Sequence, residues 1–185
     1  LDLFLGTRLN TGSYGTKTEN YILLNDGNGV FKDASEGYLG ENKLMGMVTG
    51  SEFVDIDLDG IDELIVVGEW MPIGVYKINK GKLINISSDL GLEKSNGLYN
   101  TLEVVINKDS FPDIIIGNHG LNSFFNASRE YPLTMYVNDF DGNGRNEQIL
   151  GMYYGDDLYP IVQLKDLWMQ IPSLKKQFLK FENYK

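Results

Sequence analysis

Short apolar runs recur along this chain, and each follows a polar segment rich in aspartate or asparagine. Leu64–Val67 and Ile114–Ile116 are rich in β-branched residues, and Leu3–Leu5 at the start of the chain has a similar form. Short runs of this composition, bounded by glycine, favour β-strands over helices. The glycines that close these runs and a fourth, weaker one are Gly6, Gly68, Gly117 and Gly151. The pattern therefore predicts a chain built mainly of short strands.

Two segments between these runs have the pattern of β-hairpins. Tyr21–Leu24 leads into the turn Asn25–Gly29, and Val75–Ile78 leads into the turn Asn79–Gly81. A second strand is expected after each turn, because turns rich in Asn, Asp and Gly are typical of hairpins. One unit of the chain is then a strand, an acidic loop, a strand and a hairpin, which gives four antiparallel strands. Such units are typical of β-propeller blades, so the predicted fold is all-β, a partial β-propeller.

The closing glycines are unevenly spaced, at 62, 49 and 34 residues, which loop insertions and lost hairpins would explain. We expect residues 1–157 to form about three to four blades, with the first one truncated and the set short of a whole propeller. The polar stretch 118–130 is expected to be a long loop.

Residues 158–185 are expected to form a helical insertion or appendage. Their apolar positions recur at i, i+3, i+4 and i+7, the spacing of one helix face. These positions are Leu164, Leu167, Trp168 and Ile171. Ser173 is expected to cap a second helix that carries Leu174, Phe178 and Phe181.

The net charge of the chain limits the classes of ligand that it could bind. The net charge is −10, from 26 acidic and 16 basic residues, which argues against nucleic acid as a ligand. No apolar run approaches the roughly 20 residues that span a bilayer, so no transmembrane segment is predicted. The chain has no cysteine, which excludes disulfides and thiolate metal sites.

Two complete acidic loops are the candidate metal-binding sites of the chain. Carboxylates this dense repel one another unless a cation lies among them, and Ca²⁺ takes about six to eight oxygen ligands from a loop that curls around it. Side chains at positions one, three, five and nine of each loop, with the carbonyl of position seven, are the predicted ligands. In the first loop they are Asp55, Asp57, Asp59, Glu63 and the Ile61 carbonyl. In the last loop they are Asp139, Asp141, Asn143, Glu147 and the Arg145 carbonyl.

An EF-hand also begins with alternating acids, but it needs a glutamate at position twelve and a helix on each side. Position twelve is Val66 in one loop and Leu150 in the other, and both lie in predicted strands. Asp, Asn and Gly also favour plain solvated turns. The presence of two complete loops and a near copy, each followed by a strand, favours calcium binding over plain turns. The predicted role of the ion is structural, because it would hold each loop against the strand beside it.

The middle loop departs from the pattern. Counted back from Asp113, position one is Val105, which has no side-chain oxygen, and only Asn107, Asp109 and Asp113 remain as ligands. One aspartate between Val105 and Ile106 would restore the motif. We expect weak or no calcium binding here, because the site has decayed or a residue is missing from the sequence.

The motif Asp-x-Asp-x-Asp-Gly-x-x-Glu, followed by an apolar strand and glycine, resembles the FG-GAP/VCBS repeat of integrin-α-like propellers. Further strings resemble the bacterial cartilage-acidic-protein-like ASPIC/UnbV group. These strings are Leu23–Gly29, Gly46–Thr49, Val67–Pro72, Gly117–Asn122 and Pro172–Lys176. The resemblance implies a seven-bladed propeller of secreted or cell-surface proteins, often associated with the bacterial outer membrane. It also implies calcium between the strands of a blade, and proteins that mostly bind other molecules or serve as scaffolds.

The favoured function is therefore a calcium-stabilised, extracellular binding or adhesion module for a protein or glycan. Two alternatives stay open: an accessory or catalytic domain that acts on surface polysaccharide, and a structural subunit of an outer-membrane complex. No catalytic constellation is recognisable, and His119, the single histidine, fits a turn better than a catalytic base. Trp70 and Trp168 fit core positions better than ligand platforms, and Asn126–Ser128 is a glycosylation sequon in form only.

Overall fold

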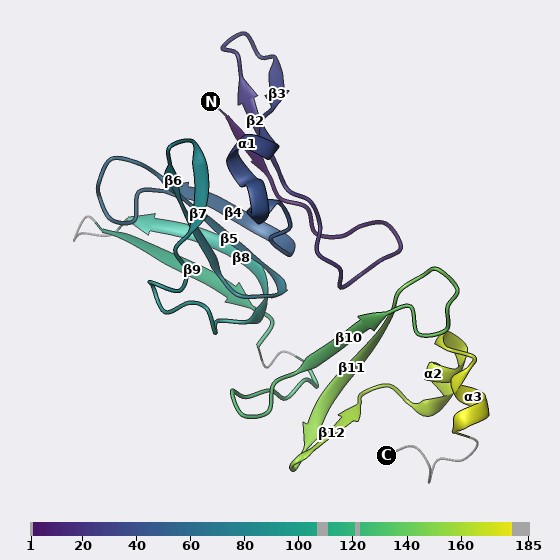
Figure 1. The fold of residues 1–185 in the computed structure, drawn as a ribbon. Coiled ribbons are helices and arrows are strands. Elements are labelled where there is room, and N and C mark those ends of the chain that lie inside the picture. The colour runs from purple at the N-terminus through teal and green to yellow at the C-terminus, as the bar shows by residue number, and fades with distance from the viewer. Residues whose placement is uncertain (1, 107–110, 121–122, 179–185) are drawn as a thin grey trace. The chain divides into compact units, whose positions relative to one another are not determined.

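The computed structural model describes residues 2–106, 111–120 and 123–178 (Figure 1). Its strands are β1 (Leu3–Leu5), β2 (Tyr21–Asn25), β3 (Phe31–Asp33), β4 (Met47–Val54), β5 (Glu63–Met71), β6 (Gly74–Asn79), β7 (Lys82–Asn85), β8 (Gly97–Ile106), β9 (Pro112–Asn118), β10 (Thr134–Asn138), β11 (Glu147–Tyr154) and β12 (Asp157–Pro160). Its helices are α1 (Ser35–Leu39), the 3-10 turn Gly40–Lys43, α2 (Leu164–Gln170) and α3 (Leu174–Gln177). The prediction of a mainly β chain is confirmed.

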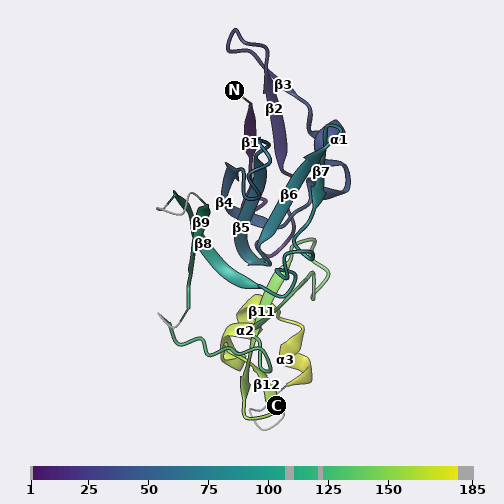
Figure 2. The ribbon, with the colours of Figure 1, turned by 90° about the vertical axis from the view of Figure 1, so that its left-hand side faces the viewer.

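The strands of the described residues form several antiparallel sheets and no closed barrel. Consecutive strands β4, β5, β6 and β7 pair side by side, with Phe53 opposite Leu64, Leu64 opposite Tyr76 and Tyr76 opposite Asn85 (Figure 2). The far end of β5 pairs with β8, and β8 pairs with β9. β1, β2 and β3 form one three-stranded sheet, and β10, β11 and β12 form another. Each acidic loop joins two strands that pair with each other.

The chain divides into two compact units. The first contains residues 1–9 and 17–120, and the second contains residues 10–16 and 121–185. β1 to β9 belong to the first unit, whereas β10 to β12, α2 and α3 belong to the second. The proposed boundary between residues 157 and 158 falls at the start of β12, and it stays a prediction.

The core of the first unit is centred on β5. Leu64, Ile65, Val66 and Val67 have no exposed surface, because β5 is an interior strand that is covered on both faces. Alternate β5 side chains join a cluster with Ile22, Leu39, Val48, Met71, Tyr76 and Leu83. Each such side chain contributes roughly 1.5–3 kcal/mol by its burial. Burial on both faces also explains why this segment is continuously apolar rather than alternating.

The helix predicted from the spacing of Leu164, Leu167 and Ile171 is present as α2, and these three side chains are buried while Trp168 is half-buried. Ser173 does occupy the N-cap position of α3, but the prediction that its side chain caps the helix is wrong. The backbone of Ser173 is already helical (φ −61°, ψ −30°), whereas a capping side chain needs an extended backbone. Phe181 lies outside the described residues. No helix in the described part of the chain is long and apolar enough to cross a membrane.

The four closing glycines lie where a neighbouring chain segment approaches closely. A Cβ on Gly68 would collide with the Met47 carbonyl, and one on Gly117 would collide with the Thr101 hydroxyl. At Gly151 the obstacle is the Thr134 hydroxyl. Gly6 directly follows β1, but β5, β9 and β11 continue past Gly68, Gly117 and Gly151, so the prediction that these three glycines end their strands is wrong. A Cβ at any of the three would require the neighbouring atoms to shift.

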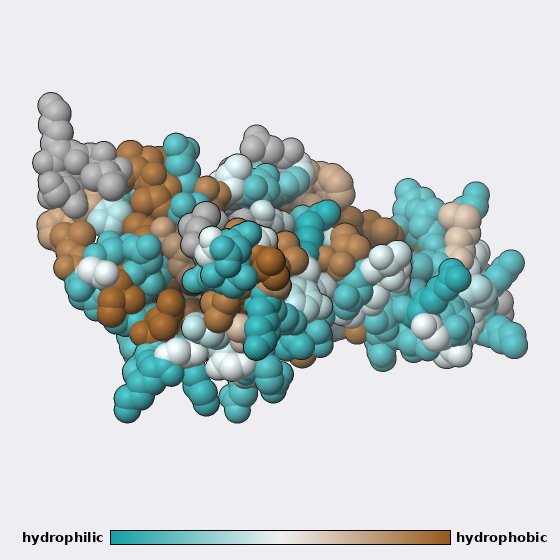
Figure 3. Space-filling model, turned by 90° about the horizontal axis from the view of Figure 1, so that it is seen from above, coloured by the Kyte–Doolittle hydropathy of each residue, from teal (hydrophilic) through white to brown (hydrophobic). Residues whose placement is uncertain are grey.

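Apolar side chains also reach the surface of several strands. Phe31 in β3, Ile115 in β9 and Tyr136 in β10 are exposed. On the face shown in Figure 3, apolar patches alternate with hydrophilic ones.

Candidate metal centres

The first acidic loop joins β4 to β5 and folds around the carboxylate of Asp55. The amides of Asp59 and Gly60 donate hydrogen bonds to its two oxygens, at 3.0 and 2.8 Å. The Asp59 amide also donates to Asp57 Oδ1 at 3.3 Å, and the Ile61 amide donates to Asp59 Oδ1 at 2.9 Å. These bonds curl the backbone around the Asp55 carboxylate.

The last acidic loop joins β10 to β11 and repeats these bonds position by position. The amides of Asn143 and Gly144 donate to the two oxygens of Asp139, at 2.9 and 2.8 Å. The Asn143 amide donates to Asp141 Oδ1 at 3.1 Å, and the Arg145 amide donates to Asn143 Oδ1 at 2.8 Å. The same local motif therefore folds the same way in both compact units.

A buried glutamate begins the strand after each loop. Glu63 is fully buried and Glu147 is 5% exposed. Oε2 of Glu63 accepts a hydrogen bond from the Ile56 amide at 3.1 Å, and Oε2 of Glu147 accepts one from the Phe140 amide at 2.9 Å. A buried carboxylate is costly without a partner charge or strong donors. The position-nine side chain therefore ties the start of its loop to the first residue of the strand.

The predicted ligands are partly brought together. One oxygen each from Asp55, Asp57 and Asp59 lies within 4.8 Å of the others, and the same holds for Asp139, Asp141 and Glu147. The roles of Asn143 and Glu63, and of the Ile61 and Arg145 carbonyls, stay predictions. The donors are all oxygens, which suits a hard divalent cation such as Ca²⁺.

Sequence reasoning missed Lys77 in β6. Its Nζ lies 2.8 Å from Asp57 Oδ2, 2.6 Å from Asp59 Oδ2 and 3.4 Å from Glu63 Oε1. The contact with Glu63 is an ion pair without hydrogen-bond geometry, because Glu63 Oε1 has no hydrogen-bond donor in the described structure. The hydrogen bonds that Lys77 donates to the carboxylates of Asp57 and Asp59 raise the pKa of Lys77 well above its usual value. The same bond from Lys77, with that from the Ile61 amide, lowers the pKa of Asp59.

The pairing of β6 with β5 brings Lys77 beside Glu63. Leu64 pairs with Tyr76, so Lys77 lies opposite Glu63, one residue further along the antiparallel pair. The Asn79–Gly81 turn fixes only the pairing of β6 with β7, in which Lys77 lies opposite Ile84, so the hairpin pattern does not place Lys77 beside Glu63.

The strand register shows that the middle loop is shorter than the other two. The pairs Val54–Glu63 and Asn138–Glu147 each enclose eight residues, 55–62 and 139–146. The pair Val105–Asp113 encloses only seven, 106–112. The side chain of Asp113 is exposed, whereas Glu63 and Glu147 are buried. Asn107 and Asp109 lie outside the described residues, so their ligand role stays a prediction.

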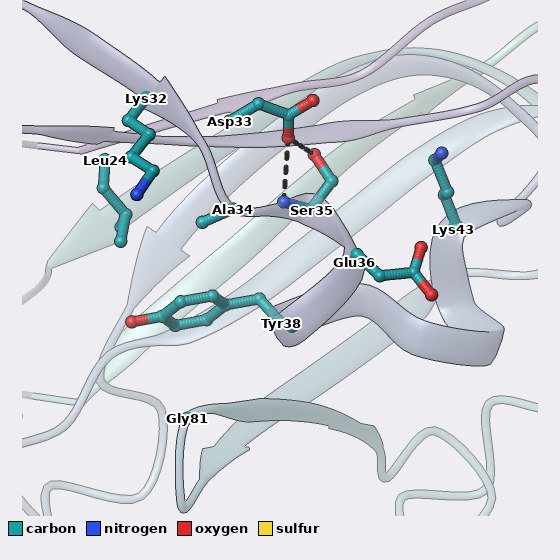
Figure 4. Close-up of a pocket in the computed structure, with 10 residues that line it drawn as sticks. Leu24, Lys32, Asp33, Ala34, Ser35, Glu36, Tyr38, Lys43 and Gly81 are labelled. Carbon is teal, nitrogen blue, oxygen red and sulfur yellow. Dashed lines mark hydrogen bonds between the residues drawn. The ribbon is translucent and has the colours of Figure 1, made fainter.

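A pocket of about 560 Å³ lies beside α1, and no residue of either acidic loop lines it (Figure 4). Its lining includes Asp33, Glu36, Tyr38 and Lys43. Asp33 accepts hydrogen bonds from the amide and hydroxyl of Ser35, which lower the pKa of Asp33. The Asp33 carboxylate thus holds the chain between β3 and α1.

Comparisons with protein-family models, curated proteins and solved structures gave no match. The functional argument therefore rests on the geometry of the two loops.

Proposed function

We propose that this chain is a calcium-stabilised segment of a β-propeller that serves as a binding or adhesion module outside the cell. The observation that carries the proposal is the agreement between the two acidic loops. Five hydrogen bonds recur at the same loop positions around Asp55 and Asp139, although the loops lie in different compact units.

Calcium explains why the carboxylates converge. Three acidic side chains with oxygens within 4.8 Å of one another repel strongly unless a cation offsets their charge. Calcium accepts irregular sets of oxygen ligands, whereas magnesium demands near-ideal octahedral geometry. Because the ligands lie on the loop and on the first residue of the next strand, a bound ion would fix the connection between paired strands.

The propeller part of the proposal is supported by the meander β4–β5–β6–β7. Four consecutive antiparallel neighbours are the content of one blade. On this view β8 and β9 begin a second blade, and β10 to β12 belong to another. The resemblance to FG-GAP/VCBS repeats and to the ASPIC/UnbV group supports the same assignment.

An extracellular location fits loops of this kind. Calcium sites of extracellular modules have dissociation constants of about 10⁻⁴–10⁻³ M, which suits the calcium level outside cells. We therefore propose a secreted or surface-bound protein, associated with a bacterial outer membrane, whose partner is a protein or a glycan.

Thermal unfolding with and without calcium tests the metal assignment. At calcium 100-fold above the dissociation constant, each site adds about 2.7 kcal/mol, and a chain of this size gains about 2–4 °C per kcal/mol. For each site at which calcium binding stabilises the fold, we expect Tm in calcium to be roughly 5–10 °C higher than Tm in chelator. The variant Asp55→Asn/Asp139→Asn should lose this rise, and Asp89→Asn, an exposed acid outside the loops, should keep it. An equal Tm with calcium and with chelator would contradict the assignment.

A glycan array followed by a reducing-sugar assay tests the binding role. The calcium-loaded chain should retain a glycan, or a surface protein in a parallel assay, without releasing sugar. Sugar release that disappears when an acid outside the loops is mutated would instead favour the polysaccharide-cleaving alternative.

A further inference from the structure

The two acidic loops share a backbone frame but differ in the charges they hold. Position five is Asp59 in one loop and Asn143 in the other, so the predicted ligands of the Asp55 loop include one more carboxylate. The Asp55 loop also has an ammonium group among its carboxylates, that of Lys77. The additional ligand carboxylate, that of Asp59, is therefore paired with a positively charged side chain of the protein itself.

Lys77 contacts the oxygens that backbone amides leave free. In Asp57 and Asp59, Oδ1 accepts a backbone hydrogen bond and Oδ2 faces Lys77. In Glu63, Oε2 accepts the Ile56 amide and Oε1 faces Lys77. These are the oxygens with which the three side chains would hold a metal ion.

Glu63 gives independent evidence for a cation at this point. Its side chain has no exposed surface, and its Oε1 has no hydrogen-bond donor. A buried carboxylate oxygen that faces an ion cluster without a donor requires positive charge beside it. Lys77 supplies this charge at 3.4 Å.

In the part of the chain that the structure describes, the Asp139 loop has no equivalent of Lys77. Gly151 pairs with Pro160, so the position opposite Glu147 corresponds to Leu164, where β12 has ended and α2 has begun. Among the described residues, no lysine or arginine forms an ion pair with Asp139, Asp141 or Glu147. The nearest donor to Glu147 Oε1 is the neutral amide of Asn143, at 3.5 Å.

We propose that Lys77 is a tethered cation that competes with calcium for the Asp55 loop and keeps that loop folded when calcium is absent. The inference rests on the proposed calcium function. A calcium ion that binds Asp57, Asp59 and Glu63 must displace the Lys77 ammonium, whereas at the Asp139 loop no protein cation is displaced. Falling calcium therefore leaves the Asp55 loop with a cation and the Asp139 loop without one.

Calorimetric titration with calcium alone, in single-loop backgrounds, tests the inference. Asp139→Asn leaves the Asp55 loop as the measured site, and Asp55→Asn leaves the Asp139 loop. In the Asp139→Asn background, Lys77→Gln should tighten calcium binding about tenfold, because the ion no longer displaces a lysine held by several carboxylates. In the Asp55→Asn background, the same substitution should change the affinity less than about twofold.

Lys82→Gln is the matched control, because it removes the same charge from an exposed position in the same hairpin. It should change calcium affinity less than about twofold in either background. Lys77→Arg keeps the charge and should bind calcium more weakly than Lys77→Gln. In chelator, Lys77→Gln should lower Tm below that of Lys82→Gln, and calcium should restore it.

The two possible failures can be distinguished. Calcium binding that is equally strong in Lys77→Gln, Lys77→Arg and Lys82→Gln would overturn the role of Lys77 and leave the calcium function standing. Absence of calcium binding in every background, with the variants folded by circular dichroism, would overturn the proposed function and this inference together.

Discussion

Leu58 and Gly142 show that the two acidic loops have the same backbone conformation at equivalent positions. Both occupy position four, and both have left-handed backbone, with φ of 60° and 75°. Position six is also left-handed in both loops, at Gly60 and Gly144. A left-handed leucine costs roughly 1–2 kcal/mol, so the Asp55 loop keeps this shape against a local preference. The bonds to Asp55 and the ion pairs of Lys77 offset that cost.

Asp33 provides a pH dependence at the scale of one residue. Its hydrogen bonds from Ser35 lower its pKa below the usual value, so its contribution to stability is complete above about pH 4 and is lost as the pH falls through the lowered pKa. Asn85 receives the same bond from the Ser87 amide in the other hairpin, which shows that an amide can replace the carboxylate. We expect Asp33→Asn to lose less stability than wild type between pH 5 and about pH 3.

Urea denaturation at several pH values measures this difference, because every other acid is common to the two proteins. Parallel stability curves for wild type and Asp33→Asn would contradict the assigned role of the carboxylate.

At the scale of elements, close strand approach is a testable feature. Gly68 in β5 faces the Met47 carbonyl of β4, a backbone atom that cannot rotate away. We expect Gly68→Ala to lower the free energy of unfolding by about 2 kcal/mol, as overpacking does in cores. Gly37→Ala is the control, since a Cβ there meets nothing within 4 Å and alanine favours the α1 helix. Chemical denaturation should show the loss only for Gly68→Ala, and equal effects would contradict the packing argument.

The elements also show how far sequence patterns reach. The strands after the loops, both hairpins and α2 follow from patterns local in sequence. The two segments Asp33-x-Ser35 and Asn85-x-Ser87 also form matching contacts. The Ser35 hydroxyl accepts a hydrogen bond from the Ile22 amide, and the Ser87 hydroxyl accepts one from the Val75 amide. Lys77 was missed because its partner Glu63 is fixed by strand register, which joins residues distant in sequence. The cap assigned to Ser173 was wrong because cap geometry depends on backbone angles that composition does not determine.

At the scale of the whole molecule, each compact unit contains one complete acidic loop. The Asp55 loop lies in the unit that holds residues 17–120, and the Asp139 loop lies in the unit that holds residues 121–185. If calcium binds at both loops, it stabilises both parts of the chain. The stoichiometry of calcium is then a property of the intact chain, and we expect two ions per molecule.

An insertion in the middle loop should change the number of calcium ions that the chain binds. Its strand pair encloses one residue fewer than the pairs around the complete loops. Insertion of an aspartate between Val105 and Ile106 restores both the eight-residue span and an acid at position one. Native mass spectrometry in calcium should then count three ions instead of two. Insertion of alanine at the same place restores the span without the ligand and should leave the count at two. A count of two for the aspartate insertion, with the protein folded, would contradict the view that loop length and the position-one carboxylate together make the site.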